Sequence, residues 1–243
     1  MGAITAPALV YWRLILDNAL RLQYLEAMGI DVWLPKAPAN VMQPPSSEIV
    51  TGNTELETTD NWDRLQAEVA NCTKCALCTT RTQTVFGSVN KKADWMLVGE
   101  APGQHEDEQG LPFVGNAGLL LTEMLRAIGL TREEVFITNI LKCRPPNNRD
   151  PHTDEVESCN GYLLRQQQLI QPKIILAIGR IAAQTLLKTD EPLAKLRGKT
   201  HTFNNTPVVV VYHPAYLLRS LIEKRKAWQD LTHALQTIKN NKR

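Results

Sequence analysis

The sequence lacks a strong net charge, a long apolar run and an even set of cysteines. Its 27 Lys and Arg residues nearly balance its 25 Asp and Glu residues, which leaves a formal net charge of +2. That balance excludes a polybasic coat and an acidic tail. With 43% hydrophobic and 21% charged residues, the composition is typical of a globular protein with a sizeable core, and it differs from that of disordered or collagen-like chains.

No segment has the length and hydrophobicity of a membrane span. The most apolar part, residues 8–16, contains Arg13 and is followed by Asp17, whereas a bilayer requires roughly 20 apolar residues. The first arginine lies inside this apolar segment, and a secretory signal would carry its positive charge earlier. We therefore expect a cytoplasmic protein that makes no membrane contact.

The five cysteines are an odd number, which argues against a framework of disulfides. Cys72 and Cys75 are separated by two residues, and Cys143 and Cys159 complete a set of four. Four thiolates suit either a tetrahedral zinc ion or an iron–sulfur cubane, and their spacing does not distinguish the two. Two alternatives stay open: the cysteines are small buried residues without a metal, or Cys78 takes the place of Cys75.

The N-terminal quarter differs in pattern from the rest of the chain. Residues 8–28 have apolar side chains near helical spacing, and Gly29 follows as a stop signal. Residues 35–60 are rich in Pro, Ser, Thr, Asn and Glu, as in flexible linkers. The sequence thus predicts an N-terminal helical appendage (residues 1–34), a linker (35–60) and one larger domain (61–243).

The larger domain alternates short apolar runs with segments of helical periodicity. The runs, at residues 95–98, 135–137, 174–178 and 208–211, are typical of buried parallel strands. The helical segments are residues 119–128, 154–170, 181–187 and 216–238. This alternation predicts an α/β fold, a three-layer α/β/α sandwich around a four-stranded, mainly parallel sheet.

Polar side chains follow three of the predicted strands. Glu100 follows the first strand, Asn139 the second and His213 the fourth. The carboxyl ends of parallel strands meet at one edge of a sheet, and ligands bind outside that edge. A carboxylate, an amide and an imidazole therefore come together where a polar reaction centre would lie.

Several ordered motifs resemble one family. They are CTKC (residues 72–75), RTQTVFG (81–87), GEAPGQHEDEQGLPFVGNAG (99–118), ITNILKCRPP (137–146) with Asn148 and Arg149, Cys159, and YHPAYLLR (212–219). Over residues 61–243 the chain resembles the family 4 uracil-DNA glycosylases of the iron–sulfur type. The resemblance implies hydrolysis of the N-glycosidic bond of uracil in DNA. It also implies a structural [4Fe-4S] cluster held by Cys72, Cys75, Cys143 and Cys159, with Cys78 outside the pattern.

The resemblance assigns three residues to the flipped uracil. Phe113 matches the family's stacking position, so its ring would offset part of the cost of unstacking the base. The amide of Asn139 can donate to uracil O4 and accept from N3–H, a pattern that cytosine reverses. His213 corresponds to the family's electrophilic histidine, which as a neutral donor to O2 would stabilise the departing uracil anion.

Further positions in the long glycine-rich motif carry expected roles. Glu100 is the candidate for orienting the attacking water, because Ala101 stands where many other glycosylase classes have an Asp. We expect Glu106 to help exclude the methyl group of thymine, and Asp107 to brace the loop. The alternative interpretation is that residues 106–108 form a solvated acidic loop.

A nearly neutral chain needs local clusters of cations to bind DNA. Arg144, Arg149 and Arg219 lie in loops at the expected active edge and are our candidates for contacting the phosphates. Leu217 and Leu218 could fill the gap that a flipped base leaves, although apolar residues at a helix start are usually core. A role on DNA would associate the protein with the nucleoid.

Residues 21–38 (RLQYLEAMGIDVWLPKAP) resemble the amino-terminal peptide of the psi subunit of the bacterial clamp loader. This short resemblance implies a replication protein as partner of residues 1–34, with Trp33 as the anchor. The alternative is a helix that packs on its own catalytic domain. Two competing functions also remain: a non-catalytic nucleic-acid-binding module with a four-cysteine zinc site, and an adaptor that acts through its N-terminal helix.

Overall fold

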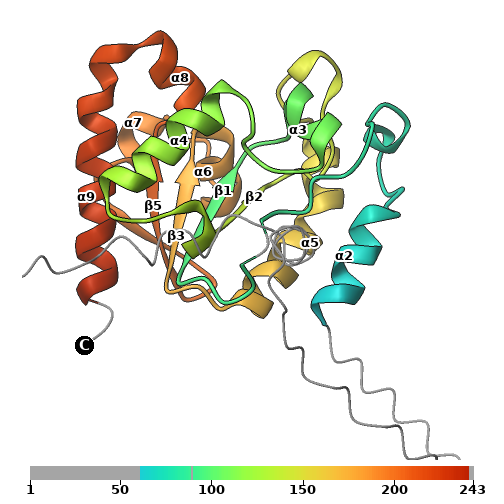
Figure 1. Cartoon of the computed structure of the whole chain (residues 1–243), viewed down its shortest axis with the longest axis horizontal. Coiled ribbons are helices and arrows are strands. Elements are labelled where there is room, and N and C mark those ends of the chain that lie inside the picture. The colour runs from blue at the N-terminus through green and yellow to red at the C-terminus, as the bar shows by residue number, and fades with distance from the viewer. Residues whose placement is uncertain (1–60, 89, 241–243) are drawn as a thin grey trace, which may run out of the picture. The chain divides into compact units, whose positions relative to one another are not determined.

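The computed structural model describes residues 61–88 and 90–240, and Figure 1 traces their elements. The expected N-terminal helix and linker lie outside the described residues. No helix in the described part of the chain is long and apolar enough to span a bilayer.

A five-stranded sheet lies at the centre of the domain, with strand order β2-β1-β3-β5-β4. The strands β1 (Trp95–Gly99), β2 (Val135–Asn139), β3 (Ile174–Ile178) and β5 (Thr206–Val211) are parallel. The edge strand β4 (Thr200–Phe203) pairs with β5 in the antiparallel sense. The side chains of β1, β2 and β3 are buried along their whole length because helices cover both faces of the sheet.

Side chains of alternate strand residues pack into two separate hydrophobic cores, one on each face of the sheet. Leu97, Ile137 and Val209 point into one core, which α4 (Asn116–Ala127), α8 (Pro214–Arg219) and α9 (Lys224–Asn240) cover. Met96, Phe136 and Val210 point into the opposite core, which α5 (Thr153–Ile170), α6 (Arg180–Leu187) and α7 (Leu193–Leu196) cover. The helices therefore lie on both faces of the sheet (Figure 1), and the predicted three-layer α/β/α class is confirmed.

A third, smaller core packs beside α5. The helix α2 (Trp62–Ala70) contributes Leu65 and Val69 to it, and the short 3₁₀ segment η2 (Ala76–Thr79) contributes Leu77. Cys143 and Cys159 are buried in the same core. This packing brings the N-terminal end of the domain against the loop that follows β2.

The structure corrects the sequence prediction in two respects. The sheet has five strands and not four, because β4 is short, polar and half-exposed and so lacks the apolar run that marks the others. Residues 216–238 were expected to form one helix, but Ser220 adopts φ −132° and ψ 73°. This non-helical residue ends α8, and the 3₁₀ turn η5 (Leu221–Glu223) then leads into α9.

Candidate active site

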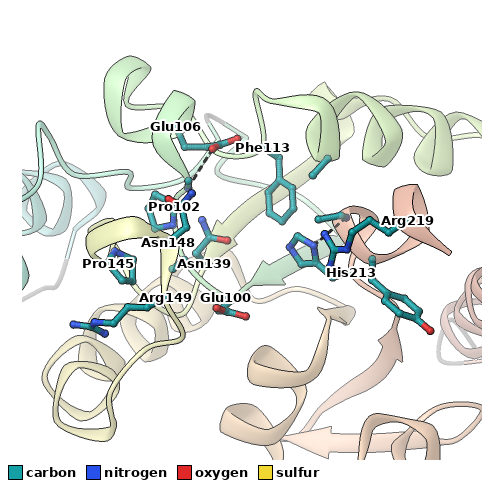
Figure 2. Close-up of a pocket in the computed structure, with 15 residues that line it drawn as sticks. Glu100, Pro102, Glu106, Phe113, Asn139, Pro145, Asn148, Arg149, His213 and Arg219 are labelled. Carbon is teal, nitrogen blue, oxygen red and sulfur yellow. Dashed lines mark hydrogen bonds between the residues drawn. The ribbon is translucent and has the colours of Figure 1, made fainter.

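A cavity of about 500 Å³ opens at the carboxyl ends of the strands. Figure 2 shows the side chains that surround it, which come from the loops after β1, β2 and β5 and from the segment before α4. The lining residues are Glu100, Ala101, Pro102, Gly103, Glu106, Phe113, Ala117, Asn139, Pro145, Asn148, Arg149, His213, Ala215, Tyr216 and Arg219. The three polar residues predicted from the strand ends therefore share one cavity.

Asn139 is the last residue of β2, and its side chain is only 2% exposed. Its Oδ1 is buried and has no hydrogen-bond partner among the described residues. A buried polar atom without a partner is costly, so most such atoms in proteins are paired. The amide oxygen of Asn139 is therefore available to a donor that enters the cavity.

Gly99, at the end of β1, leaves the room that this arrangement needs. A Cβ at Gly99 would lie 2.4 Å from Asn139 Oδ1 and 2.7 Å from Phe113 Cζ. Both contacts are far below van der Waals separation. The missing side chain lets the amide and the aromatic ring approach each other across the floor of the cavity.

Lys142 fixes the backbone of Asn139, a role that the sequence analysis did not anticipate. Its ammonium is fully buried and donates to Asn139 O at 2.6 Å, Thr138 Oγ1 at 2.7 Å and Gln166 Oε1 at 2.8 Å. A buried ammonium requires such acceptors because it has lost its hydration. One signal in the sequence is a lysine inside an otherwise apolar run, ILKC (residues 140–143).

Phe113 is buried and has the left-handed backbone value φ 53°. A bulky residue in this region is strained and needs support from its surroundings. Glu106 supplies that support, because its Oε1 accepts the backbone N–H groups of Val114 at 2.8 Å and Gly115 at 3.1 Å. The Phe113 and His213 rings lie with their centroids 5.7 Å apart.

The acidic residues after Gly103 belong to helix α3 (Gln104–Gln109) and are only partly solvated. Glu106 lines the cavity and caps the helix, since its Oε2 accepts the Gly103 N–H at 3.1 Å. Asp107 is buried and accepts the Thr82 N–H at 3.0 Å, which ties α3 to the preceding loop. Glu108 is exposed. The solvated-loop interpretation thus holds for Glu108 and fails for its two neighbours.

His213 caps the N-terminus of α8 and lines the cavity. Its Nδ1 accepts the backbone N–H of Ala215 at 3.1 Å, so in the neutral ring the proton is on Nε2. Burial, reinforced by the positive charge of Arg219, lowers the pKa of His213 to about 4, although Glu106 opposes the shift. The imidazole is therefore neutral near pH 7 and can still donate a hydrogen bond from Nε2.

Glu100 follows β1 directly and lies at the cavity wall. Burial, with the negative charge of Asp150 nearby, raises the pKa of its carboxyl to about 7, and Arg180 partly offsets this. A carboxylate with a pKa near the working pH can accept a proton and remain ionised in a large share of molecules. Glu100 thus has the properties of a general base.

The three candidate arginines lie in different surroundings. Arg219 is exposed at the end of α8 and lines the cavity. Arg149 also lines it, but its guanidinium forms two hydrogen bonds to the buried carboxylate of Glu155, at 2.9 and 2.5 Å. Arg144 lies outside the lining and donates to Asn148 Oδ1 at 2.7 Å.

Four cysteines gather in the small core beside α5. Cys143 and Cys159 are buried there, and Cys72 and Cys75 pack against the same cluster, which does not include Cys78. Arg81 Nη1 donates to Cys143 Sγ at 3.1 Å, and the Lys142 N–H donates to Cys159 Sγ at 3.3 Å. No three His, Cys, Asp or Glu side chains within residues 61–88 and 90–240 converge closely enough to ligate one metal ion.

These observations define a class of protein: an α/β/α sandwich with a cavity at its strand ends that an aromatic ring, a carboxyl, an amide and an imidazole line. Residues 86–232 match the family model of the uracil DNA glycosylase superfamily. The type-4 uracil-DNA glycosylase of Archaeoglobus fulgidus is 47% identical over 167 residues, which cover 65% of this chain and 84% of the relative.

Two further relatives agree. The type-4 uracil-DNA glycosylase of Saccharolobus solfataricus is 45% identical, over 74% of this chain and 91% of its own length. That of Thermotoga maritima is 41% identical, over 70% of this chain and 91% of its own length. The chain belongs to the type-4 uracil-DNA glycosylase family.

Proposed function

We propose that the protein removes uracil from DNA by hydrolysing the N-glycosidic bond, as the first step of base excision repair. The observation that carries this proposal is the buried, unpartnered Oδ1 of Asn139 in a cavity that an aromatic ring and a neutral imidazole also line. Family membership supports the same reaction. A uracil stacked in a duplex is out of reach, so the nucleotide is flipped into the cavity.

Recognition of the base rests on Phe113 and Asn139. The Phe113 ring provides an apolar face for the uracil ring, and Asn139 accepts from N3–H while its Nδ2 donates to O4. Cytosine would place an acceptor against Oδ1 and a donor against Nδ2. Each buried group left unpaired costs roughly 1 to 3 kcal/mol, so one rigid amide discriminates strongly between the two bases.

Cleavage leaves negative charge on uracil O2, and His213 is the group that meets it. Its Nε2–H is preorganised by the Ala215 N–H on Nδ1 and carries no positive charge near neutral pH. A neutral donor aimed at O2 strengthens its bond as the charge develops, which selectively stabilises the transition state. Glu100 orients and deprotonates the water that attacks the sugar.

Exclusion of thymine is assigned to the loop that Glu106 holds. Because both carboxylate oxygens of Glu106 accept backbone N–H groups, its side chain is fixed at the cavity wall near Phe113. A fixed wall has little freedom to yield to the extra methyl group of thymine. Ala101 and Pro102 also line the cavity.

The cysteines at positions 72, 75, 143 and 159 would hold a [4Fe-4S] cluster. A single zinc ion needs all four sulfurs about 2.3 Å from one point, whereas a cubane carries its irons at separate corners and holds its thiolates farther apart. The four cysteines pack in or against one core, and membership of the type-4 family supports the cubane. The cluster would supply no chemistry to the reaction and would fasten α2 to the loop after β2.

This assignment has a direct test. Protein purified without oxygen is predicted to absorb near 400 nm and to contain about four irons per chain. Cys143→Ser is predicted to lose most of that absorbance, and Cys78→Ser, the matched control, to keep it. Zinc in place of iron, or equal loss in both variants, would contradict the cubane and its ligand set.

Binding of DNA is assigned to the rim of the cavity. Arg219 is exposed there and suited to a phosphate contact. Arg149 also lines the cavity but is bound to Glu155, and Arg144 lies outside the lining, where it donates to Asn148. Leu217 is 1% exposed and belongs to the core, whereas Leu218 is 43% exposed. Leu218 is thus the better candidate for filling the gap left by the flipped base.

The decisive experiment measures release of free uracil from a labelled oligonucleotide without added metal, with cytosine and thymine oligonucleotides in parallel. The wild-type protein is predicted to act on uracil alone. Asn139→Asp is predicted to lose most of this activity and to gain weak activity on cytosine, because a protonated carboxyl reverses the pattern of donor and acceptor. Wild-type protein that releases no uracil would overturn the proposed function.

The proposal also assigns roles to the N-terminal residues that lie outside the described part of the chain. We assign residues 1–34 to an appendage, 35–60 to a tether and 61–243 to the glycosylase domain, acting at the nucleoid in the cytoplasm. A tether would raise the local concentration of the enzyme at a replication protein. Full-length protein is predicted to bind the chi subunit of the clamp loader, and Trp33→Ala to abolish that binding. Equal binding by the two would refute the assignment.

A further inference from the structure

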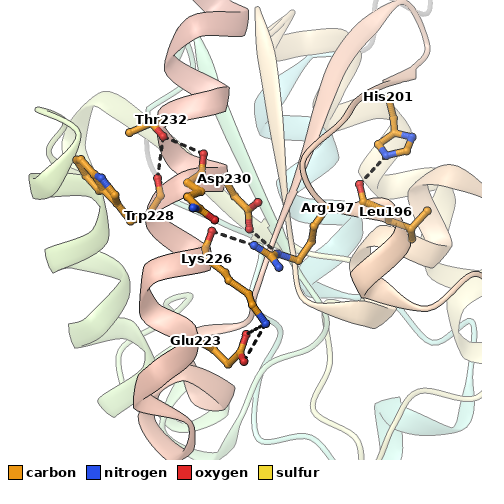
Figure 3. A network of polar contacts seen from close by, with 9 residues as sticks. Leu196, Arg197, His201, Glu223, Lys226, Trp228, Asp230 and Thr232 are labelled. Atoms are coloured by element: carbon orange, nitrogen blue, oxygen red, sulfur yellow. Dashed lines mark hydrogen bonds and ion pairs between the residues drawn. The ribbon is translucent and has the colours of Figure 1, made fainter.

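Arg197 lies in a buried ion pair on the side of the sheet that α9 covers. It follows α7, and its Nε donates to Asp230 Oδ2 at 2.6 Å while its Nη2 donates to Lys226 O at 2.9 Å. The Arg197 and Asp230 side chains are 10% and 2% exposed, so the pair is shielded from water. Figure 3 shows Arg197 reaching from its loop toward α9. The guanidinium is therefore held in one orientation.

This guanidinium lies over the ring of Tyr212. Arg197 Cζ lies 4.1 Å from the centroid of the Tyr212 ring, which is a cation–π distance. Tyr212 also packs against Tyr216, whose ring centroid is 5.1 Å away and which lines the cavity. Tyr212 is the residue directly before His213.

His213 is thus confined from several directions. The Ala215 N–H fixes its ring at Nδ1. A Cβ added at Gly179, whose φ is +91°, would lie only 3.0 Å from His213 Cβ. The backbone at the N-terminus of α6 therefore leaves His213 little room to move on that side. The segment before His213 is restrained through Tyr212 by Arg197.

We propose that Arg197, held by Asp230, is a positioning residue that fixes His213 for catalysis by stacking on Tyr212. The inference rests on the proposed function, since it concerns how His213 reaches uracil O2. Arg197 is absent from the cavity lining and acts only through the peptide that Tyr212 and His213 share. A displacement of about 1 Å at a reacting group can cost a hundredfold in rate.

The variant Arg197→Lys tests the positioning role most directly. A lysine keeps a positive charge for Asp230 but lacks the planar group that stacks on Tyr212 and reaches the Lys226 carbonyl at the same time. Uracil release is measured with enzyme in excess over DNA, so that misfolded protein raises the apparent half-saturation by enzyme and a mispositioned His213 lowers the rate constant at saturation. We expect the rate constant to fall about tenfold or more, with unchanged amplitude and unchanged half-saturation by enzyme.

A matched control and a background variant isolate the mechanism. His201→Ala removes the contact between His201 Nε2 and the carbonyl of Leu196 (2.8 Å), beside Arg197 but away from Tyr212. It is predicted to leave the rate constant unchanged. In the His213→Ala background, Arg197→Lys is predicted to have no further effect, because the group that it positions is gone.

The possible results distinguish failure of the proposed function from failure of the positioning role. If wild-type protein releases no uracil, the proposed function fails. If wild-type protein is active and Arg197→Lys cleaves at the wild-type rate, or slows His213→Ala further, the positioning role is overturned. If Arg197→Lys does not fold, Tyr212→Leu tests the same contact with the ion pair intact, and a wild-type rate constant in that variant refutes the inference.

Discussion

The elevated pKa of Glu100 predicts a specific pH profile. If the ionised carboxylate orients and deprotonates the attacking water, the rate of uracil release follows the ionised fraction of a group with a pKa of about 7. The rate should then rise about tenfold per pH unit below 7 and level off above it. At pH 5 it should be roughly 1% of the plateau.

The titration of His213 does not contribute to this pH profile. Its pKa of about 4 keeps the imidazole neutral over the whole range from pH 5 to pH 9. The acid limb should therefore report Glu100 alone. In single-turnover measurements, Glu100→Gln should lower the plateau by about 10² to 10⁴ and leave a nearly flat profile. A wild-type profile that stays flat down to pH 5, or a limb that survives in Glu100→Gln, would refute the assignment.

The Glu100 carboxyl also makes the free energy of unfolding depend on pH. Whereas the rate rises with pH, stability falls. The carboxyl's folded pKa of about 7 is above the ordinary value of 4.5, so its contribution to stability is present below about pH 4.5 and is lost as the pH rises to 7. The full shift corresponds to about 3 kcal/mol, which partial solvent access reduces to about 1 to 2 kcal/mol. Glu100→Gln should raise the free energy of unfolding in urea by that amount at pH 8 and not at pH 4. The exposed control Glu123→Gln should not.

Three further variants test the other walls of the site. His213→Ala should lower the single-turnover rate constant by about 10² to 10³ with little change in half-saturation, because it removes a bond that tightens in the transition state; a loss confined to binding would contradict this role. Phe113→Ala should weaken productive binding of uracil DNA by roughly 1 to 3 kcal/mol, measured as half-saturation by enzyme, and wild-type half-saturation would contradict stacking. Lys142→Met should lower the free energy of unfolding by roughly 1 to 3 kcal/mol, because it removes three hydrogen bonds to buried acceptors; wild-type stability in urea would contradict the network.

The sequence predicted those parts of the fold in which one local signal dominates. The four buried parallel strands were recognisable because both faces of each are apolar, and Asn139 and His213 were found because each lies at or just beyond the carboxyl end of such a strand. The strand β4 was missed because its stability comes from pairing with β5 and not from its own polar residues. The break at Ser220 was missed because the apolar periodicity of α8 resumes in α9.

The site could be predicted only in part for a related reason. Residue types at strand ends, and the resemblance of the motifs, named the side chains that face the base. Neither could give the contacts that hold them, since these join residues far apart in the chain. Lys142 donates to Gln166, and the Thr82 N–H donates to Asp107. Arg149 and Glu155 are close in the chain, but nothing in their spacing shows that the guanidinium is bound to the carboxylate.

Several locally unfavourable features of the described domain lie at the cavity. Phe113 has a strained backbone, Asn139 Oδ1 is buried without a partner, and Glu100 and His213 both lose hydration on folding. Each would be more stable in another conformation or in water, and the fully buried strands beneath them hold them in place. In the proposed complex, uracil offers a flat ring to Phe113, an N–H donor to Asn139 and, to His213, a carbonyl that gains negative charge. In the proposed mechanism, binding of the base gives Asn139 Oδ1 its missing donor, and the departing anion gives the neutral His213 donor a charged acceptor, which favours the transition state.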